Sequence, residues 1–149
     1  AEAEGLRVEV MQDAPGFKRF ALTGEDDALV LDRVHERVVQ LHPRKLEFDG
    51  VLVDPPDEIL ANKLTALVGR MEERDLVDVM LLERGQLRAE DLLGTAERKA
   101  VTPATLAWLL ASVEIPDGAD LPAGVPPEEL RGWLQGFVAR MRKLAFPTD

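Results

Sequence analysis

The stretch of sequence that decides the fold lies between residues 62 and 78 and reads NKLTALVGRMEERDLVD. Apolar residues recur at helical spacing on both sides of a short charged break, which is the pattern of two amphipathic helices. The first helix is predicted to last to about Gly69, and the second to run from about Arg74 to Glu83. This segment therefore predicts a helix-turn-helix that carries a polar face.

The polar face holds five charged side chains in a fixed order: Lys63, Arg70, Arg74, Asp75 and Asp78. At about 100° per residue, all of them except Asp75 would lie within roughly 80° of one another on an uninterrupted helix. A break between the helices would still leave Lys63 and Arg70 on one face. Two interpretations stay open: a solvated face of ion pairs, which is the commonest role of charges on helices, or a functional cluster.

Residues before this segment follow the two-residue period of half-buried strands. Strands are predicted over residues 6–10, Phe17–Leu22 and Ala28–Val34, in the order of an antiparallel meander. A hairpin is predicted over residues 46–53, because Asp49-Gly50 between two apolar runs supplies the positive φ angles of a tight turn.

Helical patterns begin after the hairpin. Asp54 is predicted to cap the first helix with Pro55 at its first position, and Thr102 to cap a later one. The later helices are predicted over Ala89–Lys99, Pro103–Ser112 and Glu128–Leu144. The expected fold class is therefore α+β, with a small, mostly antiparallel sheet in residues 1–54 and a C-terminal helical bundle in residues 55–149.

Composition excludes several kinds of protein. The chain has 149 residues, 46% of them hydrophobic, which is enough for one domain with a core. Its formal charge of −10 disfavours wide contact with nucleic acid. The absence of cysteine excludes disulfides and thiolate zinc sites. No run has the roughly 18 apolar residues of a membrane span, so a cytoplasmic location is expected.

The charged order of the helix-turn-helix has a counterpart in a known family. Residues 57–78 read DEILANKLTALVGRMEERDLVD, which is an acidic helix start followed by Lys, six residues, Arg, three residues, Arg-Asp, two residues and Asp. This segment resembles the AbiEii/AbiGii toxin family of nucleotidyltransferase-fold proteins. Upstream, Asp32 ends a strand where that family presents its third metal-binding carboxylate. The resemblance is visible from about Leu6 to Leu93.

The resemblance implies transfer of a nucleotide from a nucleoside triphosphate to an acceptor hydroxyl, with magnesium held by carboxylates that include Asp32. It implies that Lys63 contacts triphosphate oxygens, that Arg70 or Arg74 binds phosphate, and that Asp75 and Asp78 orient these cations or accept a proton. Asp75 is equally well explained as a charge favoured by the helix dipole. A toxin of this type would use tRNA or a similar acceptor and have an antitoxin partner.

The sequence departs from the family pattern at the metal site. The family's early Gly-Ser or Gly-Gly turn, the helix after it and the Asp-x-Asp pair are absent, and Gly24–Asp27 reads as a hairpin tip. We therefore expect either the C-terminal part of a longer nucleotidyltransferase-like protein or a degenerate relative.

Two other functions compete with this interpretation. An aminoglycoside- or lincosamide-type adenylyltransferase would share the charged helix and take a small acceptor, in keeping with the acidic surface. A noncatalytic interaction module would present the apolar stripe of residues 130–144 to a partner, with Trp133 and Phe137 outward. The commoner role of such a stripe is core packing.

Overall fold

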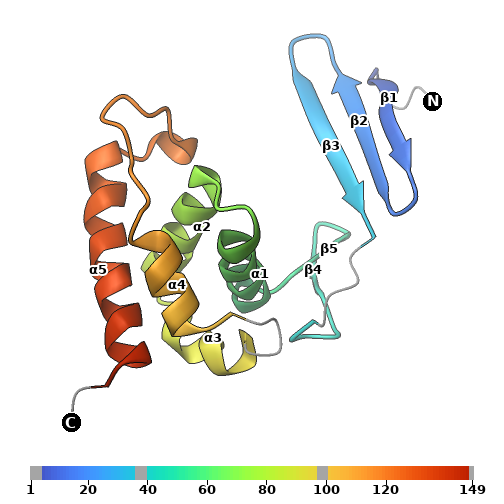
Figure 1. Ribbon diagram of the computed structural model, residues 1–149. Coiled ribbons are helices and arrows are strands. Elements are labelled where there is room, and N and C mark those ends of the chain that lie inside the picture. Colours follow the sequence, from blue (N-terminus) through green and yellow to red (C-terminus); the bar gives the residue numbers. More distant parts are fainter. Residues whose placement is uncertain (1–4, 36–39, 97–100, 148–149) are drawn as a thin grey trace. The chain divides into compact units, whose positions relative to one another are not determined.

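Strands come first along the chain and helices follow (Figure 1), which confirms the predicted α+β class. The computed structural model describes residues 5–35, 40–96 and 101–147. No helix within these ranges is long and apolar enough to cross a membrane.

By compactness the chain divides into two units, Ala1–Val38 and Val39–Asp149. The first unit holds a three-stranded sheet, and the second holds a two-stranded hairpin and the helices. The predicted division between residues 54 and 55 stays a prediction, while compactness alone groups the hairpin with the helices.

The sheet of the first unit is an antiparallel meander of β1 (Arg7–Ala14), β2 (Phe17–Thr23) and β3 (Ala28–Val34). The register of β1 against β2 shifts between Val10 and Gln12, as expected for a β-bulge. Gly24 closes the second turn by donating its N–H to the carbonyl of Asp27 over 2.8 Å, which confirms a hairpin tip there.

The hairpin of the second unit pairs β4 (Leu46–Phe48) with β5 (Val51–Val53). Asp49 and Gly50 have φ angles of 47° and 75°, the left-handed values that a two-residue hairpin turn requires. The predicted hairpin and its turn are therefore confirmed.

The helix-turn-helix consists of α1 (Pro56–Gly69) and α2 (Glu73–Arg84). Its predicted starting cap was wrong, because Pro55 is the capping residue and Pro56 the first helical one. The reason is local: a residue that precedes proline is kept out of the helical region, and Pro55 accordingly has a ψ of 151°. Asp54 instead forms an ion pair with Lys45.

Three further helices follow, and each lies close to its predicted position. Thr102 caps the middle one, since its hydroxyl accepts the N–H of Thr105 over 3.1 Å. Residues 97–99 of the predicted Ala89–Lys99 helix lie outside the described residues. The helices are α3 (Ala89–Ala96), α4 (Pro103–Leu110) and α5 (Pro127–Ala145), with a short 3₁₀ turn at Pro122–Gly124.

The apolar stripe of α5 forms part of the core. Phe137 is fully buried, and its ring lies 4.9 Å from that of Trp133, centroid to centroid. Trp133 is half-buried and donates its indole N–H to Glu83 over 2.9 Å. These contacts confirm the core interpretation and contradict a stripe that presents Trp133 and Phe137 outward.

Arg140 joins three helices of the bundle. From α5, its guanidinium donates to Glu83 of α2 at 2.6 and 2.8 Å and to Glu90 of α3 at 2.7 Å. The same guanidinium lies 5.3 Å from the centre of the Phe137 ring. A single side chain thus neutralises two carboxylates at the point where the helices meet.

Candidate functional site

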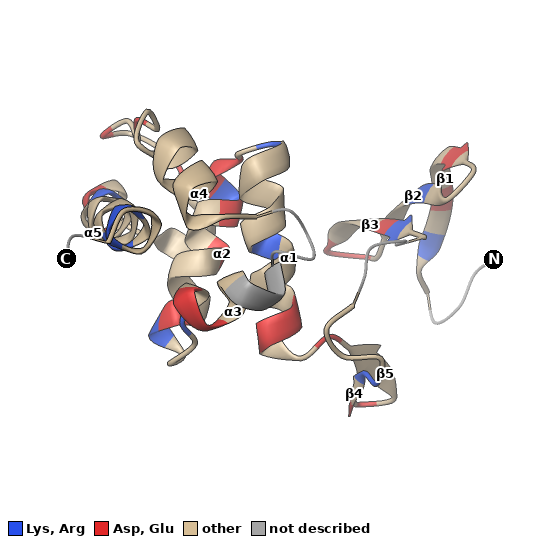
Figure 2. Ribbon diagram, turned by 60° about the horizontal axis from the view of Figure 1, so that its bottom comes forward, with Lys and Arg blue, Asp and Glu red and all other residues tan. Residues whose placement is uncertain are grey.

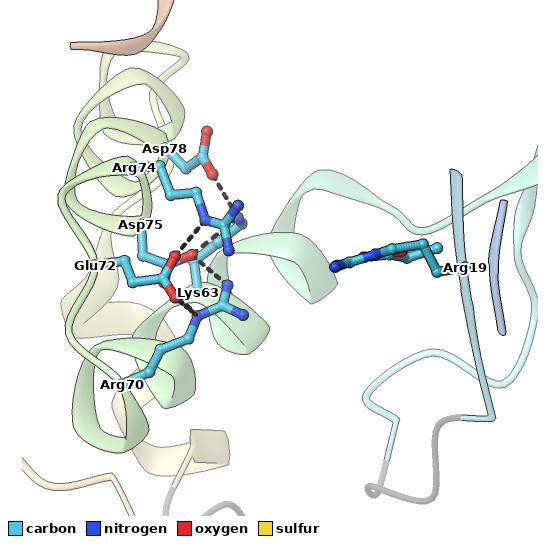
Figure 3. Close-up of polar contacts among 8 residues, drawn as sticks. Arg19, Lys63, Arg70, Glu72, Arg74, Asp75 and Asp78 are labelled. Atoms are coloured by element: carbon cyan, nitrogen blue, oxygen red, sulfur yellow. Dashed lines mark hydrogen bonds and ion pairs between the residues drawn. The ribbon is translucent and has the colours of Figure 1, made fainter. Parts of the chain in front are cut away.

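The turn between α1 and α2 brings the predicted charged residues together. Arg70 ends α1, and Met71 adopts a positive φ of 50°, which reverses the chain before Glu72 caps α2. The N–H groups of Arg70 and Met71 both donate to the carbonyl of Ala66, at 2.8 and 3.3 Å. This turn lets side chains from the middle of α1 meet side chains from the first turns of α2 (Figure 3).

Asp75 is the centre of the cluster, and none of its side-chain surface is exposed. Arg70 grips its carboxylate with two donors, Nε to Oδ2 at 2.8 Å and Nη2 to Oδ1 at 2.9 Å. Lys63 donates to Oδ1 from α1 at 3.1 Å. A buried charge is tolerated only when it is paired and hydrogen-bonded, and here two cations fulfil that condition.

The ionisation of the central groups follows from these contacts. Hydrogen bonds from Arg70 lower the pKa of Asp75, and they and Lys63 together outweigh its burial, which acts in the opposite direction. For Lys63, burial lowers the pKa, but hydrogen bonds to Asp78 and Asp75 exceed this effect and raise the pKa overall. Hydrogen bonding to Asp75 likewise raises the pKa of Arg70. The three groups are therefore held in their charged forms.

The outer part of the cluster is open to solvent. Asp78, whose side chain is 39% exposed, forms a second ion pair with Lys63. Arg74 is 59% exposed, and its Nε lies 2.5 Å from Glu72 Oε2. The three cations, Lys63, Arg70 and Arg74, are therefore matched by three carboxylates, one buried beneath them and two exposed beside them.

A comparison with known protein families identifies the family of this chain. The family described as "Nucleotidyl transferase AbiEii toxin, Type IV TA system" matches residues 13–146. The chain belongs to this family of nucleotidyltransferase toxins. The match extends from β1 to the end of α5, well beyond the part in which the resemblance was visible from the sequence. No curated protein matched the chain, and no solved structure did.

Four of the five predicted cluster residues of this AbiEii chain lie in one connected set of ion pairs, and Arg74 joins it through Glu72. The grouping rests on the turn rather than on a continuous helix. Burial of Asp75 and its three hydrogen bonds from Arg70 and Lys63 favour its orienting role, because they fix these two cations in place. The catalytic roles of Lys63, Asp75 and Asp78 stay predictions.

Asp32, the predicted metal ligand, lies on β3 in the first unit. Its carboxylate accepts two hydrogen bonds of 2.7 Å from Arg19 on the neighbouring strand, and this pairing raises the pKa of Arg19. Among the residues that the structure describes, no group of three or more His, Cys, Asp or Glu side chains could hold a metal ion. Since these residues do not form a three-carboxylate site, we assign no step to magnesium in this AbiEii chain.

Two residues of the helix-turn-helix have contacts that the sequence did not predict. Glu58 is fully buried, and its Oε2 accepts the N–H groups of Leu41 and His42, at 2.5 and 3.0 Å. Glu58 therefore anchors the segment that precedes β4 to α1. Glu72, which lies between the two helices, bridges two arginines. An acidic residue at a helix start was the signal available for both, but that pattern usually reports only the helix dipole.

Stability should depend on the ionisation of Asp75. Because its folded-state pKa lies below the ordinary value of 3.8, the ionised group stabilises the fold above that value, and this contribution is lost as the pH falls through the folded-state pKa. We expect Asp75→Asn to show a shallower fall in the free energy of unfolding between about pH 5 and pH 2 than the wild type. Urea unfolding at each pH measures this, and parallel curves would contradict it.

Proposed function

We propose that this AbiEii-family chain binds a nucleoside triphosphate at the helix-turn-helix cluster and acts in transfer of its nucleotide to an acceptor hydroxyl. The observation that carries the proposal is the buried carboxylate of Asp75, which holds Lys63 and Arg70 side by side. Preorganised cations of this kind stabilise the charge of a transferring phosphoryl group.

Lysine and arginine have different tasks in this proposal. Lys63 acts as a compact point charge for the triphosphate oxygens, and the planar guanidinium of Arg70 or Arg74 binds two oxygens at once. Asp75 positions Lys63 and Arg70, and Asp78 orients Lys63 from the exposed side. Magnesium enters the proposal only as the ion that accompanies the triphosphate.

The proposed acceptor is tRNA or a similar RNA hydroxyl, in keeping with the toxin family. Figure 2 shows Lys and Arg interspersed with Asp and Glu along the elements, and the chain carries a net charge of −10. RNA contact would therefore be confined to a small area. A cytoplasmic location and an antitoxin partner belong to the same proposal. An aminoglycoside acceptor is the alternative that the acidic surface favours.

Replacing Lys63 with alanine tests the triphosphate site. A hydrogen bond between charged groups contributes about 1.5–3 kcal/mol, so Lys63→Ala should weaken binding about 10- to 100-fold. Isothermal titration of the 149-residue chain with each of the four magnesium nucleoside triphosphates measures the affinity. Lys143→Ala, which removes an exposed lysine of α5, is the matched control and should bind as the wild type does.

Equal affinities for the two alanine variants would refute the site, as would a wild-type chain that binds no triphosphate. Thermal melting separates loss of contact from loss of fold, because Asp75 keeps both hydrogen bonds from Arg70 when Lys63 is removed. Incubation with α-phosphate-labelled triphosphates and either tRNA or an aminoglycoside then distinguishes the acceptors by which of them takes up the label.

A further inference from the structure

Glu72 occupies an unusual position at the edge of the cluster. It is the capping residue of α2, yet its side chain makes no capping hydrogen bond. Its carboxylate instead lies between two arginines, with Oε2 at 2.5 Å from Arg74 Nε and Oε1 at 3.8 Å from Arg70 Nε (Figure 3). An anion of the protein itself is thus placed where the guanidinium groups face solvent.

The two carboxylates that contact Arg70 differ in how firmly they are held. Asp75 is buried and takes two hydrogen bonds from the guanidinium, so this pairing fixes the position of Arg70. Glu72 is 43% exposed, and its partner Arg74 is more exposed still. Exposed ion pairs contribute little to stability, so the contact of Glu72 is the one that is easily exchanged.

A phosphate group would compete well for the position of this carboxylate. Like a carboxylate, it offers two oxygens to arginine. A terminal phosphate also carries more negative charge than a carboxylate, so the guanidinium groups attract it more strongly. Displaced from Arg74, the Glu72 side chain would point into solvent without leaving a buried charge behind.

We propose that Glu72 is an internal competitor for the phosphate groups of the ligand. In the free protein it occupies Arg74 and offsets the charge of Arg70, and it leaves both when a triphosphate binds. The inference rests on the proposed triphosphate site. Its consequence is that Glu72 sets the affinity of the site, because every bound triphosphate must displace it.

Two isosteric variants one residue apart test the competitor. Glu72→Gln removes the competing charge, and Glu73→Gln removes the same charge from an exposed neighbour in the first turn of α2. We expect Glu72→Gln to bind magnesium nucleoside triphosphates about fivefold more tightly, which is the effect of one unit charge a few ångströms away in a water-like medium. Glu73→Gln should change the affinity less than about twofold, because screening weakens more distant exposed charges.

A third variant shows whether Arg74 carries the effect. In an Arg74→Ala background, Glu72→Gln should tighten binding less than it does in the wild type, since only Arg70 is left for Glu72 to offset. Titration calorimetry gives the affinities, and thermal melting verifies that each variant folds. Equal gains for Glu72→Gln and Glu73→Gln, weaker binding by Glu72→Gln, or an undiminished gain without Arg74 would each overturn the competitor. Absence of binding by the wild type and by Glu72→Gln alike would instead overturn the proposed site.

Discussion

Replacing Asp75 with asparagine should lower the free energy of unfolding by about 3 kcal/mol, the low end of the range for breaking a buried ion pair. The amide has the same shape but no charge, so Lys63 and Arg70 lose the carboxylate that they share. Both cations reach solvent, so water can partly replace the lost carboxylate. The expected loss of stability therefore lies at the low end of that range. Urea unfolding at neutral pH measures the difference.

Asp78→Asn is the matched control for this prediction. It removes the same charge from the same helix, and Asp78 contacts the same lysine, but its side chain is exposed. Its loss should be below about 1 kcal/mol, as for other exposed pairs. Similar losses for the two variants would mean that burial of Asp75 has no energetic importance. Asp75→Asn should also weaken triphosphate binding, because Lys63 and Arg70 would no longer be held together.

Arg140→Met is expected to be the more destabilising change, with a loss of about 4 kcal/mol. Methionine fills a similar volume without charge, and it removes the guanidinium that Glu83 and Glu90 share, while these carboxylates are only 11% and 18% exposed. Within the described part of the chain, Glu83 then keeps only neutral donors, the N–H groups of Trp133 and Ala89, and Glu90 keeps Arg88 at 3.5 Å. Oε2 of Glu90 is already buried without a hydrogen-bond partner among the described residues. The two neighbouring carboxylates would then repel each other, so that one of them takes up a proton or the helices that carry them move apart.

Arg142→Met is the control, since Arg142 lies on the same helix and is exposed. It should cost less than about 0.5 kcal/mol, as surface substitutions generally do. A second comparison uses Glu83→Gln and Glu90→Gln together with Arg140→Met. If the lost neutralisation of the two carboxylates causes the destabilisation, the triple variant should recover part of the stability in urea unfolding; no recovery would instead point to lost packing against Phe137.

Local chemistry explains why much of the fold could be predicted from the sequence. The Asp49-Gly50 turn and the Thr102 cap depend on backbone preferences and contacts within a few residues. The start of α1 was also decided locally, but by the restriction that Pro56 imposes on its predecessor, which the N-cap prediction overlooked.

The candidate site could be predicted only in part. Spacing along α1 and α2 indicated that Lys63, Arg70 and Asp78 share one face, and the structure connects them through ion pairs. Spacing did not indicate that Asp75 lies beneath them without solvent exposure. Burial of a helix position depends on what packs over it, and the sequence pattern of a first-turn aspartate is the same whether it is buried or solvated.

The sequence by itself thus determined the α+β order of elements, the hairpin turns at Gly24–Asp27 and Asp49-Gly50, and the residues that carry charge on the helix-turn-helix. The tertiary structure alone decided which of those charges is buried and which are exchangeable. It set Asp75 under two cations and left Glu72 at the surface between two arginines, and it joined Arg140 to glutamates 50 and 57 residues away. The physical reason is that periodicity and turn propensity act over a few residues, whereas desolvation depends on every element that packs against a side chain.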